Sequence, residues 1–408
     1  MEIDRSSLLD CVKAQDLCNP DCVTLGYDRE QLASAALEVV ANGFSKLTLG
    51  EVEIRRNMTF CVRSSPHAVA LRCLNRRIRQ ATGIRPADRD IIVRRLARIL
   101  TEGVPHRVYK FDIRKFFDSI DTTRLFGEIA NDKRVPRSAI LVLENFLFEL
   151  LDRNIHGLPR GIPLSSTLSE YCLKGFDQVV SKLPEVYYYA RYVDDIVIVT
   201  GAREDRAQFS RQIKEQLPFL LRFNDAKTKL IDLPVQQRGD GSNIIGEFDY
   251  LGYGFSVHET SRVKRRLCRH VQVSIADKKI RRIKSRLSRA VAAFVGDSDI
   301  GLLESRLQLL TGNFNLRDIA TGRVRNVGLY CNYRRANSDQ ALAGLDAFLR
   351  SLFVGDRSSL SRRLATKLSH SQRCSFLKFS FSKGFGNRIF YNFTPAELAR
   401  LTLCWRDA

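Results

Sequence analysis

The sequence predicts a mixed α+β fold, and two kinds of pattern carry that prediction. Residues 187–200 place aromatic and β-branched side chains on both sides of a short break, which is typical of two strands joined by a tight turn. Residues 108–112 indicate another short strand. Residues 68–100 and 136–153 instead repeat apolar side chains at helical spacing. The chain therefore combines at least one antiparallel hairpin with several helices.

The charge balance favours a polyanionic partner. The 408 residues include 66 Lys or Arg against 45 Asp or Glu, a formal net charge of +21. An excess of this size indicates nucleic acid first and an anionic membrane surface second. No apolar run approaches the roughly 18 residues of a spanning helix, and the N-terminal residues lack a signal-peptide core. We therefore expect a cytoplasmic protein that does not bind a membrane.

The ten cysteines are scattered and form no CxxC pair. No histidine near Cys11, Cys18 or Cys22 completes a zinc site, so we expect reduced thiols throughout.

The first 60 residues predict helical and loop segments, and an arginine-rich pair of helices follows them. Gly83 and Pro86 divide residues 68–100 into two helices, with Asp88 as the cap of the second. Few acidic residues lie one turn away from the arginines, which suits phosphate binding because the guanidinium fork matches phosphate oxygens. A solvated helix face is the alternative for each arginine.

Three aspartates indicate a metal site. Asp112 ends the short strand, and Asp194 and Asp195 lie at the tip of the hairpin. Ionised side chains stay out of a dry core unless they are paired or hold a metal. A metal ion is best surrounded by oxygens from separate strands, so Asp112 supplies what the adjacent pair lacks. Asp118 and Asp121 are interpreted as acids at helix starts.

A loop rich in Gly and Pro, residues 157–163, leads into a helix whose predicted cap is Ser165 or Ser166. Glycine in such a loop lets the backbone approach a ligand closely.

Five segments, in order, resemble the motifs of reverse transcriptases. Tyr192-Val193-Asp194-Asp195 resembles the family's YxDD box, and the other four resemble its motifs A, B, D and E: residues 108–120, 157–171, 221–230 and 247–254. The family commonly has Gln where this chain has Arg160. The resemblance covers the middle of the chain.

The resemblance implies a role for individual residues. Asp112, Asp194 and Asp195 would hold two Mg²⁺ ions, with Mn²⁺ as a substitute, and Lys227 would donate a proton to the departing pyrophosphate. The remaining positions fall into two groups: dNTP binding by Ile113, Phe116, Phe117, Arg160 and Gly161, and primer grip by Tyr250, Leu251 and Gly252.

The chain after residue 257 is expected to be helical and basic. Residues 262–289 contain twelve Lys or Arg and one acid, Asp277. The apolar stripe of residues 280–294 has helical spacing, and the basic residues between its members are expected to face outward. Phosphates of a template–primer duplex are the predicted contacts of Lys278, Lys279, Arg282 and Arg286. Residues 236–242 predict a polar loop.

The implied fold is a right-hand polymerase with an antiparallel-sheet palm, helical fingers and a helical basic thumb. The fingers with the N-terminal region would be residues 1–107, the palm residues 108–256, and the thumb with the C-terminal region residues 257–408. Residues 122–156 would be a helical insertion that packs with the fingers.

The implied activity is RNA-directed DNA synthesis from dNTPs on an RNA template, extending a primer into a DNA product. The stand-alone bacterial reverse transcriptases of phage defence and abortive infection are similar in size and in their basic C-terminal region. They imply an antiviral role and a dedicated non-coding RNA as template, and they leave a protein partner or a homo-oligomer open. Two alternatives remain: an RNA-dependent RNA polymerase, and an RNA-binding scaffold without catalysis.

Overall fold

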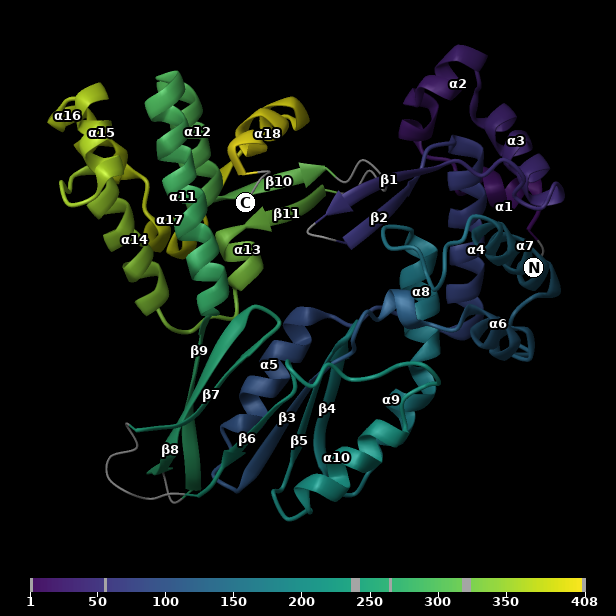
Figure 1. The fold of residues 1–408 in the computed structure, drawn as a ribbon, viewed down its shortest axis with the longest axis horizontal. Coiled ribbons are helices and arrows are strands. Elements are labelled where there is room, and N and C mark those ends of the chain that lie inside the picture. Colours follow the sequence, from purple (N-terminus) through teal and green to yellow (C-terminus); the bar gives the residue numbers. More distant parts are fainter. Residues whose placement is uncertain (1–2, 55–56, 236–242, 264–265, 318–323, 406–408) are drawn as a thin grey trace. The chain divides into compact units, whose positions relative to one another are not determined.

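The computed structural model describes residues 3–54, 57–235, 243–263, 266–317 and 324–405. The chain divides into two compact units, the first formed by Met1–Ile92 and Pro105–Asp232, the second by Val93–Val104 and Leu233–Ala408. Helices and antiparallel strands occur in both, as the α+β prediction requires (Figure 1).

The first unit contains helices, short 3-10 turns and strands in mixed order. Its helices are α1 (Arg5–Leu9), α2 (Pro20–Leu25), α3 (Arg29–Ala41), α4 (Ser65–Thr82), α6 (Thr122–Ala130), α7 (Arg137–Asp152), α8 (Pro163–Cys172), α9 (Lys174–Val180) and α10 (Arg206–Glu215), with 3-10 turns η1 (Ala14–Cys18) and η2 (Phe117–Ser119). Its strands are β1 (Leu49–Ile54), β2 (Asn57–Val62), β3 (His106–Asp112), β4 (Val186–Tyr192), β5 (Asp195–Thr200) and β6 (Lys229–Leu233). Helix α5 (Arg89–Leu100) begins in the first unit and continues into the second.

A four-stranded sheet in the order β4-β5-β3-β6 supports the site of the first unit. Strand β5 runs antiparallel to both of its neighbours, and its four central residues, Ile196 to Val199, are fully buried. Helices α9 and α10 contribute aromatic packing: Phe176 meets Tyr189, and Phe209 lies 4.9 Å from Tyr109, ring centre to ring centre. The predicted strands at 108–112 and 187–200 are confirmed.

Helix α4 is the centre of the helical part of this unit, because it packs against α3, α7 and α8. Gly83 ends α4 in the left-handed conformation, with a φ of 70°, that glycine adopts without strain. The Asp88 carboxylate accepts from the amides of Asp90 and Ile91 at the start of α5. Both predicted helices, their division and the cap are confirmed.

The hairpin formed by β1 and β2 corrects the prediction for the first 60 residues, which expected only helices and loops. Its strands alternate small or apolar residues with polar ones, which is the two-residue period of a strand. The alternation is short, and Glu51 and Glu53 give it a polar composition that resembles a loop.

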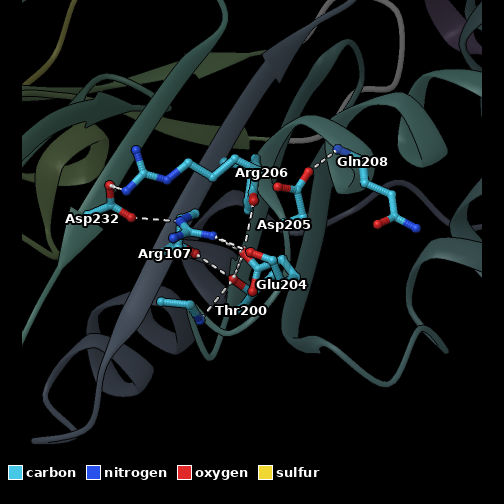
Figure 2. A network of polar contacts seen from close by, with 9 residues as sticks. Arg107, Thr200, Glu204, Asp205, Arg206, Gln208 and Asp232 are labelled. Atoms are coloured by element: carbon cyan, nitrogen blue, oxygen red, sulfur yellow. Dashed lines mark hydrogen bonds and ion pairs between the residues drawn. The ribbon is translucent and has the colours of Figure 1, made fainter.

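A polar network around Arg107 ties the sheet together near the start of β3 (Figure 2), at the other end of the strand from Asp112. Arg107 donates to Glu204 at 2.9 Å and to Asp232 at 2.6 Å. The hydroxyls of Tyr109 and Thr200 each donate to Glu204 at 2.8 Å. Only 8% of the Arg107 side chain and 6% of the Glu204 side chain are exposed, so the two charges depend on each other and on these bonds.

The second unit contains two small sheets and a group of helices. Its strands are β7 (Ile244–Tyr250), β8 (Tyr253–Val263), β9 (Arg266–Ile275), β10 (Asn313–Arg317), β11 (Val324–Gly328) and β12 (Phe390–Tyr391). Its helices are α11 (Asp277–Asp297), α12 (Ile300–Thr311), α13 (Leu329–Tyr333), α14 (Gln340–Phe353), α15 (Ser359–Lys367), α16 (His370–Ser375), α17 (Phe381–Gly386) and α18 (Pro395–Thr402), with 3-10 turns η3 (Phe376–Lys378) and η4 (Leu403–Trp405). The sheet orders are β7-β8-β9 and β11-β10-β12.

The expectation of a helical chain from residue 257 onward is wrong in two places. Strands β8 and β9 continue to Ile275, and β10, β11 and β12 form a second sheet. In β9 the buried residues Arg269, Val271, Val273 and Ile275 alternate with the more exposed His270, Gln272 and Ser274, so the period is that of a strand. The many Lys and Arg residues before Val271 gave the segment the composition of a basic helix, so the sequence did not predict this strand. The polar loop predicted at 236–242 lies outside the described residues.

No helix among the described residues is both long and apolar enough to cross a membrane. All ten cysteines are free thiols in the structure.

We expect Glu204→Leu to lower the free energy of unfolding by about 3–5 kcal/mol, because it leaves the Arg107 guanidinium buried without its main partner. The matched control is Glu128→Leu, whose ion pair with Arg124 at 3.8 Å is more than half exposed and should contribute about 1 kcal/mol or less. Urea unfolding followed by circular dichroism measures both variants. Equal losses in the two variants would contradict the importance of the buried network.

Candidate active site

The three aspartates of the predicted metal site lie together at one end of the neighbouring strands β3 and β5. Asp112, the last residue of β3, is the ladder partner of Asp195, the first residue of β5. Direct partners in an antiparallel ladder have Cα atoms about 4.5–5.5 Å apart. Asp194 precedes Asp195 in the two-residue turn between β4 and β5. The structure therefore brings together the carboxylates that the sequence singled out.

Main-chain bonds hold this arrangement from both sides. The amide of Ile113 donates to the carbonyl of Asp194 at 3.1 Å, and the amide of Asn224 donates to the carbonyl of Asp112 at 2.7 Å. Ile113 also pairs with Phe223 in a single antiparallel bridge. The segment resembling motif D is thus bonded directly to the segment resembling motif A.

The carboxylates lie in a partly dry environment and repel one another. Burial, followed by the nearby Asp112 charge, raises the pKa of Asp194. Burial and then the Asp194 charge raise the pKa of Asp195 to about 6. Because raised carboxyl pKa values mean that the negative forms are destabilised, a cation beside these oxygens would stabilise the site.

Lys227 supplies one such cation. Its Nζ donates to the two carboxylate oxygens of Asp112, at 2.9 and 3.0 Å, and this hydrogen bond raises the pKa of Lys227. The lysine side chain is 61% exposed, so it reaches Asp112 from the solvent side. Sequence reasoning placed Lys227 near the reaction, and the structure adds a direct contact with the strand-borne aspartate.

The donor set fits a divalent cation that is shared with a substrate. Among the described residues, no group of three or more His, Cys, Asp or Glu is arranged to hold a metal ion by itself. Mg²⁺ in nucleotide enzymes is commonly bound through one or two carboxylates together with substrate phosphates and water. Asp112, Asp194 and Asp195 provide carboxylate oxygens of that kind.

The dNTP-binding positions that the resemblance implies differ in exposure. Ile113 and Phe116 are 1% exposed and belong to the hydrophobic core, whereas the Phe117 ring is half-buried. The Arg160 guanidinium lies over the Phe117 ring, 5.7 Å from its centre, and pairs with Asp118 at 3.3 Å. Phe117 is therefore the aromatic side chain of this segment that a ligand can reach.

The loop before α8 packs closely against strand β2. Gly161 has a φ of +96°, and a Cβ atom there would lie 2.4 Å from the carbonyl oxygen of Phe60. The amide of Phe60 donates to the carbonyl of Arg160 at 2.7 Å. Glycine is required at position 161 by both the backbone angle and the space.

One expectation about helix starts needs correction. Helix α8 begins at Pro163 with Ile162 as its N-cap, so neither Ser165 nor Ser166 is the cap. Proline suits the first helical position because its missing N–H would have no partner there. Asp121 caps α6 and Asp118 lies in the first turn of η2, as expected for acids at helix starts, and Asp118 also pairs with Arg160.

The proposed primer-grip residues form a tight turn in the second unit. Leu251 and Gly252 have φ values of 49° and 81° and connect β7 with β8. Tyr250 is 1% exposed, and the Gly252 carbonyl accepts from the amide of Ala276 at 3.2 Å.

The basic residues of α11 do not all face solvent. Lys278 is exposed, and Lys279 and Arg282 are half-buried. Arg286 stacks on Trp405 at 5.4 Å, and Lys284 lies over Phe348 at 5.3 Å. The expected outward basic face is thus confined mainly to the first turns of the helix, because aromatic side chains cover its later residues.

Two arginines of α4 form ion pairs with acidic residues of the first unit. Arg72 makes a two-bond ion pair with Asp16 at 2.8 and 3.0 Å, and Arg76 pairs with Asp10 at 3.5 Å. Arg72 therefore stabilises the fold, a role that differs from both phosphate binding and a solvated helix face.

Sequence reasoning missed Arg191, which is 4% exposed and contacts Glu170, Asp177 and the carbonyl of Val193. An arginine inside an otherwise aromatic and apolar strand was the signal that could have found it.

A strand-borne aspartate thus faces a two-aspartate turn in an antiparallel sheet. Residues 68–255 match the family described as "Reverse transcriptase (RNA-dependent DNA polymerase)". This match covers less than half of the chain and supports an RNA-dependent DNA polymerase, and domains of the matched family generally use divalent metal ions.

The solved structures that resemble the chain include two telomerases. Apo telomerase from Candida tropicalis, truncated from the C-terminal domain, has a TM-score of 0.30 and 15% identity over 47% of this chain and 43% of its own. Telomerase from Candida albicans in complex with a fragment of telomeric RNA has a TM-score of 0.33 and 12% identity over 92% and 68%. The chain thus spans less than half of the first telomerase. No curated protein matches it.

We expect Phe117→Ala to admit ribonucleotides. The half-buried ring has no hydrogen-bond acceptor and can exclude a 2′-hydroxyl only by occupying space. The ratio of kcat/KM for a dNTP to that for the matching rNTP should fall on the order of 10²-fold in the variant. Phe126→Ala, which removes a half-buried phenylalanine of α6, is the control and should leave the ratio unchanged. A wild-type enzyme that uses rNTPs equally well would refute the role of the ring.

We expect replacement of Lys278, Lys279 and Arg282 by Gln to weaken duplex binding regardless of sequence. Loss of three phosphate contacts should reduce the slope of log Kd against log salt by roughly 2 to 3 units. The control replaces three basic residues of α15, Arg362, Arg363 and Lys367, and makes the same change in net charge. Fluorescence anisotropy with a labelled RNA–DNA duplex measures both slopes, and identical slopes would show that α11 presents only a solvated face.

Proposed function

We propose that this protein is an RNA-directed DNA polymerase that extends a primer with dNTPs along an RNA template. The observation that carries the proposal is the ladder pairing of Asp112 with Asp195 next to the Asp194 turn, within the residues that match the reverse transcriptase family. The net charge of +21 supports a nucleic-acid partner.

Asp112, Asp194 and Asp195 would hold two Mg²⁺ ions, for which Mn²⁺ can substitute. Bound divalent ions supply the positive charge that stabilises the attacking and leaving oxygens of nucleotidyl transfer. The raised pKa values of Asp194 and Asp195 support this role because they reflect carboxylates that gain from a nearby cation.

Lys227 would act at the leaving group. A protonated ammonium beside Asp112 can donate a proton to pyrophosphate, and its raised pKa keeps it charged at neutral pH. Lys227 and a metal ion would compete for the same two oxygens of Asp112. The lysine would therefore be released toward the phosphates when the metal binds.

The segments resembling motifs A and B would bind the incoming nucleotide. Phe117 would contact the sugar, Ile113 and Phe116 would contribute their backbone, and Gly161 would let the chain approach the nucleotide closely. Arg160 would contribute positive charge, and it already lowers the pKa of Asp194 in part.

The proposed layout has fingers at 1–107, a palm at 108–256 with its helical insertion at 122–156, and a thumb with the C-terminal region at 257–408. Tyr250, Leu251 and Gly252 would support the primer, and the start of α11 would contact duplex phosphates. The resemblance to stand-alone phage-defence reverse transcriptases supports an antiviral role and a dedicated non-coding RNA as template.

Two alternatives are less well supported. An RNA-dependent RNA polymerase would need a residue that accepts a hydrogen bond from the 2′-hydroxyl, and Phe117 has no acceptor. A scaffold without catalysis has no need to bring three mutually repelling carboxylates together, because that arrangement destabilises the fold.

We expect Asp112→Asn and Asp194→Asn to abolish dNTP incorporation while the melting temperature and RNA affinity stay close to those of the wild type. Each change removes a charged oxygen but little volume. Asp225→Asn is the control, because its carboxylate is 86% exposed and its pairing with Lys214 is 3.7 Å long. Primer extension on an RNA template, thermal melting and filter binding are measured together. Continued extension by both site variants would exclude this assignment.

A further inference from the structure

The buried side chain of Arg191 connects the catalytic turn with two helices. Its five N–H donors are all used: two bonds reach Glu170, two reach Asp177, and the fifth reaches the carbonyl oxygen of Val193 at 2.9 Å. Glu170 belongs to α8, the helix after the Gly161 loop, and Asp177 belongs to α9. Both carboxylates receive two bonds each, so they fix the plane of the guanidinium before it meets the turn.

The turn itself needs an external constraint. Val193 has a φ of 59°, a left-handed conformation that β-branched residues rarely adopt and that costs about 1–3 kcal/mol. Glycine is the residue usually found at a position of this kind in two-residue hairpins. A strained residue persists only where its surroundings hold it. The Arg191–Val193 bond is one contact that holds this turn, and the packing of the Val193 side chain against the hydrophobic core is another.

The bonded carbonyl belongs to the peptide group that joins Val193 to Asp194. Fixing the plane of this peptide fixes the direction in which Asp194 leaves the turn, and the Ile113 amide fixes the next carbonyl at 3.1 Å. Two successive peptide groups are therefore held, one by a side chain of β4 and one by the backbone that follows β3.

We propose that Arg191 is a positioning residue that sets the orientation of Asp194 and Asp195 by clamping the strained peptide of Val193 to Glu170 and Asp177. The clamp rests on the proposed function for its effect on catalysis, but the geometry of the turn does not depend on that function. Lysine cannot replace the arginine, because it has three donors on one atom and no planar fork.

Arg107 provides a matched control within the same unit. It is also a buried arginine of the four-stranded sheet with two carboxylate partners, Glu204 and Asp232, but its bonds lie at the end of β3 away from the turn (Figure 2). Arg191→Lys and Arg107→Lys therefore remove comparable ion pairs from the two ends of the sheet.

The test compares these variants by hydrogen exchange and by kinetics. In Arg191→Lys, amide exchange in the metal-free protein should increase in the peptide that covers residues 190–196. kcat should fall roughly 10- to 100-fold, the range found when groups that orient metal ligands are lost, while KM for the primer–template stays unchanged. In Arg107→Lys, exchange should increase near residues 200–207 and kcat per folded molecule should stay unchanged.

A second variant separates positioning from general destabilisation. Val193→Gly removes the strain of the left-handed residue, so Arg191→Lys should lower kcat less in the Val193→Gly background than in the wild type. Equal losses of kcat in both backgrounds, or the same exchange pattern in the Arg191 and Arg107 variants, would overturn the clamp. If the wild type does not incorporate dNTPs, the proposed function fails, and the exchange measurement still decides the clamp.

Discussion

The alignment of β3 with β5 is the constraint on which the site depends. Asp112 faces Asp195 only in this register, and a slip of one residue would turn Asp112 to the other face of the sheet. Strand β5 is buried on both faces, so an alternation of polar and apolar residues cannot define its register. The main-chain bonds of Asp112 and Ile113 contribute to that definition at the end of the strands where the three aspartates lie.

The same register creates an electrostatic cost. Burial and the neighbouring carboxylate charges raise the pKa values of Asp194 and Asp195, and the folded state gains nothing from that repulsion. Lys227 offsets part of it on Asp112. Features that lower stability in this way are expected where function requires them.

The sequence was informative where the chemistry lies in consecutive residues. The two-aspartate hairpin, the strand ending at Asp112 and the arginine-rich helices could be predicted because each pattern is local. Arg191 could not be assigned, since its partners Glu170 and Asp177 are 21 and 14 residues away and only the fold brings them together. Strand β9 was missed for another reason: its charge concealed a two-residue period that packing against β8 makes decisive.

The departure at Arg160 illustrates how one substitution relative to the family pattern is accommodated. A glutamine there would be neutral, whereas Arg160 brings a positive charge into the neighbourhood of Asp194. That charge needs an anchor, and Asp118, 3.3 Å away, provides one while the Phe117 ring supports the guanidinium from below. The arginine is thus held by residues of the same segment that carries Asp112. Its position links the loop before α8 to the segment that follows Asp112, a connection that glutamine could make only through a neutral donor and without an ion pair.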